Sequence, residues 1–112
     1  MTSALGPRLF GSVPRTRVLL TVALLESSYP REIARVAGVP LQSVQRIVDD
    51  LERQRVLASR LRGRQREVRL DPSFYASSEL RSLLLRLSDG DPALTETVES
   101  LRRRPRRARK PL

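Results

Sequence analysis

Hydrophobic residues recur at helical spacing over three segments in the first half of the chain. Residues 14–25, Pro30–Ala37 and 41–55 place apolar side chains three and four positions apart, which predicts three helices. Proline suits the first turn of a helix, so the prolines at the head of the first two segments mark helix starts, and Gly38 marks the end of the second helix. The third helix is expected to bury four residues: Val44, Ile47, Val48 and Leu51.

The pattern changes to strand-like segments after residue 55. Segments 56–61 and 67–70 flank the sequence Arg62-Gly63-Arg64-Gln65, where the glycine permits a tight hairpin turn, so we expect a two-stranded wing. A last helix is predicted from an N-cap at Ser78 to Leu87. Four leucines lie on one side of this helix: Leu80, Leu83, Leu84 and Leu87.

These elements fit one small domain with a mainly α (α+β) fold, in which a three-helix core carries a two-stranded β wing and a C-terminal helix. We expect an irregular N-terminal arm over residues 1–13 and the folded domain over residues 14–87. Residues 88–101 are predicted to be a linker or short helix, with Leu94, Val98 and Leu101 at helical spacing. Residues 102–112 are predicted to be a disordered basic tail.

The positive charge of the chain is concentrated at its end. The net charge is +10, and seven of the 22 basic residues lie in residues 102–112. A block of like charge at a terminus often contacts polyanions. We expect this tail to add a salt-sensitive and sequence-independent attraction to nucleic acid.

Residue types that the chain lacks exclude several classes of function. It contains no cysteine and no histidine. Disulfides, thiolate nucleophiles, imidazole bases and the usual soft-metal sites are therefore excluded. No apolar run reaches the roughly 18 residues of a membrane span. We expect a cytoplasmic protein that is not an enzyme, needs no cofactor and does not associate with a membrane.

Residues 31–51, REIARVAGVPLQSVQRIVDDL, have the spacing of a helix-turn-helix. Two helices that cross sharply need a small residue at their contact, a glycine in the turn and apolar residues on the second helix. Four residues meet these needs in order: Ala34, Gly38, Val44 and Ile47. With the basic hairpin LxSRxRGRxREVRL after it, the stretch 9–87 resembles winged helix-turn-helix transcription regulators, especially the ArsR-like group.

The metal-sensing members of that group have paired cysteines where this chain has Tyr29, Pro30 and Arg31. Thiolate metal sensing is therefore not implied by the resemblance.

A regulator of this kind binds double-stranded DNA with its third helix in the major groove. The first half of that helix is expected to present four side chains to base edges: Gln42, Ser43, Gln45 and Arg46. Asp49 and Asp50 lie further along and repel phosphate, so only the first half is expected to insert.

The wing is expected to reach flanking phosphates or a narrow minor groove. Alternate residues of a strand share a face, so four arginines are expected to concentrate positive charge there: Arg60, Arg62, Arg64 and Arg66. Gly63 lets the tip approach the DNA backbone closely.

Two other functions remain open from the sequence. RNA or ribosome binding also suits a small arginine-rich chain, although its four aromatic residues are scattered. A winged helix can also serve as a protein interaction module. The leucines of residues 80–87 either pack on the domain's own core or form a seam between copies, and we expect a homodimer through the terminal helices.

Overall fold

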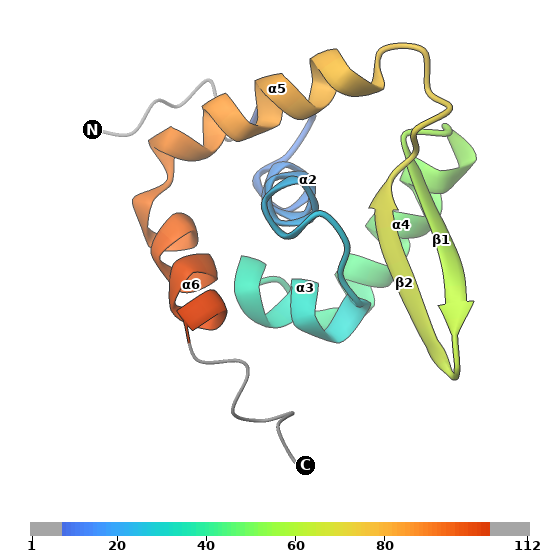
Figure 1. Cartoon of the computed structure of the whole chain (residues 1–112), viewed down its shortest axis with the longest axis horizontal. Helices are drawn as coiled ribbons and strands as arrows, with labels where there is room; N and C mark the ends of the chain where they lie inside the picture. The colour runs from blue at the N-terminus through green and yellow to red at the C-terminus, as the bar shows by residue number, and fades with distance from the viewer. Residues whose placement is uncertain (1–7, 104–112) are drawn as a thin grey trace.

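The computed structural model describes residues 8–103, in which five helices, one 3₁₀ turn and a two-stranded sheet surround a single core. Helix α2 is seen end-on in the middle of Figure 1, and the other helices and the sheet are arranged around it. The elements in chain order are α2 (Val13–Leu25), α3 (Pro30–Ala37), α4 (Leu41–Arg53), β1 (Leu57–Arg62), β2 (Gln65–Leu70), α5 (Ser77–Leu87), the 3₁₀ turn η1 (Ser88–Gly90) and α6 (Pro92–Arg103).

Helix α2 is buried from Val18 to Ala23, because from Val18 onward all its side chains except Thr21 are apolar. Its start is capped by Ser12, whose side-chain oxygen accepts a hydrogen bond from the Arg15 N–H at 3.2 Å. Val18 and Val22 have no exposed surface, and Leu19 is only 1% exposed. This helix therefore holds the others in place around it.

The helix-turn-helix forms where the sequence predicts it, with α3 at its predicted bounds and α4 ending at Arg53, two residues before the expected end. Helix α3 spans Pro30–Ala37, and Gly38 follows it with a left-handed backbone (φ +70°), a conformation that favours glycine. The Gly38 N–H donates to the Ala34 carbonyl at 3.0 Å, so the turn closes the end of the helix. In α4, Val44, Val48 and Leu51 are buried and Ile47 is half-buried, which confirms the predicted inward face.

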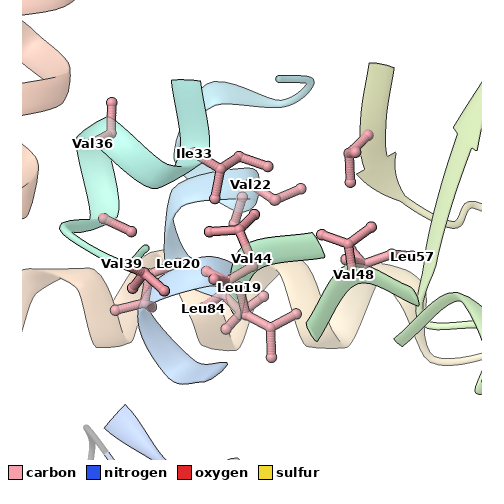
Figure 2. Close-up of a cluster of buried hydrophobic side chains, with 14 of the residues drawn as sticks. Leu19, Leu20, Val22, Ile33, Val36, Val39, Val44, Val48, Leu57 and Leu84 are labelled. Carbon is pink, nitrogen blue, oxygen red and sulfur yellow. The ribbon is translucent and has the colours of Figure 1, made fainter. Parts of the chain in front are cut away.

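The core takes side chains from every helix and from both strands. Figure 2 shows the part where α2, α3, α4, β1 and α5 meet. Burial of such side chains is the main favourable term in folding. The largest side chains that are less than 2% exposed include Leu19, Ile33, Val44, Leu57, Val68, Leu84, Leu94 and Val98.

The wing is an antiparallel hairpin whose turn contains Gly63 and Arg64. Its pairing runs from Leu57 opposite Leu70 to Arg62 opposite Gln65. Gly63 has φ +67°, which explains the glycine at this position. We did not predict a contribution from Ser28, which exchanges two backbone hydrogen bonds with Val68 (2.9 and 2.7 Å) and acts as a one-residue third strand. These bonds tie the base of the wing to the start of α3.

The start of α5 differs from the prediction. The helix begins at Ser77, and its N-cap is Ala76, which makes no side-chain hydrogen bond. Ser78 lies inside the first turn, where its hydroxyl donates to the Glu79 carboxylate at 3.3 Å, so its assignment as the N-cap was wrong. The preceding turn is held instead by backbone hydrogen bonds, such as that from the Ser77 N–H to the Phe74 carbonyl.

Of the expected linker or short helix over residues 88–101, the structure has the helix: η1 leads into α6, which is longer than expected and is part of the core. Leu94 has no exposed surface and Val98 is 1% exposed, because both side chains pack against the rest of the domain. The helix continues to Arg103, so Arg102 and Arg103 are helical residues and not part of a tail. The rest of the predicted tail, residues 104–112, and residues 1–7 of the predicted arm lie outside the described part of the chain.

Most of the leucines on α5 are used by the domain itself. Leu84 has no exposed surface, and Leu80 and Leu87 are partly buried against the core. Leu83 is 41% exposed. Within residues 8–103, no helix is long and apolar enough to cross a membrane.

Candidate nucleic-acid interface

Helix α4 carries a stripe of exposed polar residues on the side opposite its buried face. We call Gln42, Gln45, Arg46, Asp49 and Arg53 the outward stripe of α4; all five are exposed. They share one side because residues three and four apart align on a helix. Ser43, the remaining predicted base contact, is half-buried beside the stripe, and its hydroxyl accepts a long hydrogen bond from Arg46 at 3.4 Å.

The two halves of α4 differ in how their charges are paired. Within residues 8–103, no carboxylate forms an ion pair with Arg46, and Gln42 and Gln45 make no side-chain hydrogen bond. The second half carries Asp49, Asp50 and Glu52, and each of these carboxylates is paired with an arginine from another element. The first half therefore presents polar groups that can bind a ligand.

Arg66 of β2 joins the wing to the second half of α4. Its Nη2 atom lies 2.7 Å from an Asp49 oxygen and 3.0 Å from a Glu52 oxygen. Its Nε atom donates to the Ser59 hydroxyl at 3.3 Å, and that hydroxyl donates to Glu52. Burial alone lowers the pKa of Arg66, but the hydrogen bonds to the two carboxylates outweigh it and raise the pKa. We call Arg66, Asp49, Glu52 and Ser59 the wing clamp.

The wing clamp contradicts the prediction that four wing arginines share one face. A two-residue turn pairs Arg62 with Gln65, so even-numbered residues of β1 lie on the same face as odd-numbered residues of β2. Arg66 is paired with Leu61 and therefore lies on the face opposite to Arg60 and Arg62. The alternation was correct within each strand but reverses across the hairpin.

The other face of the wing also contains an acidic partner. The Nε atom of Arg60 lies 3.1 Å from a Glu67 oxygen, and an Arg62 nitrogen lies 3.8 Å from the same oxygen. The hydrogen bond from Arg60 lowers the pKa of Glu67. Arg64, in the turn, is exposed, and no carboxylate of residues 8–103 pairs with it. Arg64 thus places a positive charge without an ion-pair partner among residues 8–103 at the tip of the wing, beside Gly63.

Asp50 is held by Arg15 of α2, whose Nη2 atom lies 2.7 Å from the carboxylate. This hydrogen bond lowers the pKa of Asp50, with a smaller contribution from Arg53 at 3.4 Å. We expected Asp49 and Asp50 to repel phosphate, but arginines from the wing and from α2 offset both charges. Among the described residues, no group of three or more potential ligands could hold a metal ion.

The chain was compared with known proteins at the level of sequence and of structure. No protein-family model and no curated protein matches its sequence. A cysteine-to-serine mutant of MarR from E. coli superposes with a TM-score of 0.59 and 20% identity, over 87% of this chain and 70% of that one. A MarR family transcriptional regulator from Silicibacter pomeroyi DSS-3 superposes with a TM-score of 0.57 and 22% identity, over 84% and 65% of the two chains.

These similarities concern the fold, since sequence identity is low in both comparisons. This chain spans about two thirds of the length of the two matching structures. The ArsR-like group is not represented by these two structures. Residues 8–103 therefore adopt the winged-helix fold seen in MarR regulators.

Proposed function

We propose that the chain is a transcriptional regulator that binds double-stranded DNA sequence-specifically, with α4 in the major groove. The outward stripe of α4 carries this proposal. Its first half exposes Gln42, Gln45 and Arg46 on a helix whose other side is fixed by Val44 and Val48, each without exposed surface. Glutamine suits adenine and arginine suits guanine at major-groove edges.

The wing supports the same proposal by providing charge beside the reading helix. Arg62 and Arg64 at the tip are expected to contact phosphates or the minor groove next to the bases that α4 reads. Arg60 is partly offset by Glu67, and Arg66 belongs to the wing clamp, so we expect smaller direct contributions from these two.

The first test is selection of a preferred duplex from a random DNA library, followed by fluorescence anisotropy of the full chain. Arg46→Ala should lower affinity for the selected duplex about 5- to 150-fold and leave affinity for unrelated duplexes nearly unchanged. Arg86→Ala is the matched control, because this arginine is 84% exposed on α5. Equal loss on selected and unrelated duplexes in Arg46→Ala would contradict base reading.

A variant of the wing distinguishes contacts with the DNA backbone from contacts with the bases. Arg62→Ala combined with Arg64→Ala should weaken binding to all duplexes and reduce the slope of log K against log salt by up to about 2. A structured RNA that competes better than the selected duplex would favour the RNA-binding alternative. DNA binding that ignores both the Arg46 and the wing variants would favour a protein interaction module.

We also propose that the protein binds as a homodimer, although α5 and α6 use most of their apolar residues internally. Leu83 is the large hydrophobic residue that α5 leaves exposed. Leu83→Glu should shift a dimer to monomer in light scattering, and an unchanged mass would exclude this seam. The ArsR-like resemblance stays a prediction, and the DNA-binding proposal does not depend on it.

A further inference from the structure

A pocket lies at the base of the wing, where the end of α2, the end of β2 and the start of α5 meet. Its volume is about 480 Å³, and its lining includes Val22 of α2, Leu70 of β2 and Arg81 of α5. Figure 1 shows the loop between β2 and α5 at the end of the sheet away from the hairpin turn. Pockets that bind small molecules have volumes in this range. No residue of the outward stripe of α4 lines this pocket, so it is separate from the proposed DNA-binding surface.

Part of the pocket is apolar. Val22 has no exposed surface and Ala23 is 2% exposed, and the half-buried Leu70 and Phe74 line the pocket as well. Tyr75 also lines it and is 94% exposed, with its ring 5.1 Å from that of Phe74 in an edge-to-face arrangement. An aromatic ring left in water can bury apolar surface when a ligand binds beside it. This part of the pocket therefore suits an apolar group.

Three charged side chains line the same pocket: Glu26, Arg69 and Arg81. The carboxylate of Glu26 lies 3.3 Å from a nitrogen of Arg81. Arg69 is exposed, and no carboxylate of residues 8–103 forms an ion pair with it. The nearby Asp71 accepts hydrogen bonds from the backbone and hydroxyl of Ser73 instead, at 2.8 and 2.7 Å. The pocket thus combines an arginine without an ion-pair partner, a carboxylate and apolar surface.

Glu26 has a backbone conformation that favours glycine. Its φ of +71° and ψ of −42° lie outside the small left-handed region that other residues adopt. Such strain lowers stability, and strained residues gather at sites where function requires a particular side chain. The ion pair with Arg81 contributes little in return, because the two side chains are 71% and 43% exposed. A role of the Glu26 carboxylate in binding a ligand explains why this position is not a glycine.

We propose that this pocket binds a free α-amino acid with an apolar side chain. The carboxylate of the ligand pairs with Arg69, its ammonium group pairs with Glu26, and its side chain lies against Leu70 and Phe74. A carboxylic acid without an ammonium group would give Glu26 no partner in the ligand, and an amine without a carboxylate would give Arg69 none. The bound amino acid connects the base of the wing to α5.

The test is isothermal titration calorimetry of the full chain without DNA, with L-phenylalanine and L-leucine as probes. We expect at least one of them to bind. Its N-acetyl derivative lacks the ammonium group and its amide lacks the carboxylate, and each should bind about 5- to 50-fold more weakly. L-Serine keeps both charges but lacks the apolar side chain, and should also bind more weakly. Because no DNA is present, the result does not depend on the proposed function.

Variants of the protein assign each charge of the ligand to its partner. Arg69→Ala should bind the amino acid and its amide with equal affinity, and Glu26→Gln should bind the amino acid and its N-acetyl derivative with equal affinity. Arg86→Ala is the control, because this arginine is 84% exposed on α5 and does not line the pocket, and it should keep both preferences. Glu26→Gly should weaken binding but raise the urea concentration at which the protein unfolds, because glycine relieves the strained backbone.

Absence of binding by both probes at about 10 mM would overturn the inference. Binding of the amide and the N-acetyl derivative as tightly as the amino acid would also overturn it. The same holds if Arg69→Ala and Glu26→Gln keep the preferences of the parent protein, since the ligand would then lie elsewhere.

Discussion

The first and second halves of α4 belong to one helix but have different surroundings. In the first half, Gln42, Gln45 and Arg46 point outward without a carboxylate partner in residues 8–103. In the second half, Asp50 is paired with Arg15 of α2, and Asp49 and Glu52 are paired with Arg66 of the wing. The polar side chains of the first half are available to a ligand, whereas the carboxylates of the second half are paired with arginines of other elements.

This difference explains how acidic residues can lie on a helix that is proposed to bind DNA. A carboxylate directly beside a phosphate costs binding energy. Here each of the two aspartates faces an arginine from another element, so the acidic half fixes the angle between helix, wing and α2. The position of a charge along the helix therefore matters more than the net charge of the helix.

The largest effect on stability is expected from a substitution in the buried face that both halves of α4 share. Leu51 is 3% exposed, and Leu51→Ala should lower the free energy of unfolding by about 2–4 kcal/mol because it leaves a cavity. Urea unfolding followed by circular dichroism measures this. DNA affinity under native conditions should fall for every sequence alike. A loss of sequence preference alone would mean that the halves are not held by one core.

A smaller effect is expected from opening the wing clamp. Arg66→Ala leaves Asp49 and Glu52 unpaired, and should reduce stability by about 1–2 kcal/mol, since Arg66 is 28% exposed and makes three polar contacts. Arg46→Ala is the comparison and should change stability by less than about 0.5 kcal/mol. If both variants unfold at the same urea concentration as the parent, the proposed division of α4 is wrong.

The smallest effect on stability is expected from replacing Asp50, and this effect depends on pH. Its pKa is lowered in the folded state by the hydrogen bond from Arg15, so its ionised form stabilises the fold above the unfolded pKa of about 3.9. This stabilisation is lost as pH falls through the lower folded value. Asp50→Asn should therefore be less stable than the parent at pH 7, and the difference should shrink as pH falls below about 4. Urea unfolding across this range is the measurement; a constant difference would exclude ionisation as its cause.

The parts of the fold that local signals determine were predictable from the sequence. Helix α3 begins at a proline and ends at a left-handed glycine, and its observed bounds agree with the prediction. The positions of Val44, Val48 and Leu51 followed from spacing alone. Such features depend on residues within one or two turns of each other.

The remaining features depend on contacts between residues far apart in sequence. The spacing of Leu94 and Val98 indicated a helical turn, but not that α6 completes the core against α2 and α3. The partners of Arg66 follow only when the hairpin register is known, and a two-residue turn at Gly63 was the signal that fixes it. The one-residue strand at Ser28 has no pattern that a sequence can display.

Arg17 connects three segments through a single side chain. Its Nε atom donates to the Ala37 carbonyl at the end of α3, at 2.7 Å, and its Nη1 atom lies 2.5 Å from Asp91, which also accepts from the Leu94 N–H at the start of α6. Local opening of α6 therefore also loosens the turn that leads into α4. Amide protons of α3, the turn and α6 should exchange with solvent as one cooperative unit. A protein fused or bound at the end of α6 would therefore act on α4 through the local folding equilibrium of this unit.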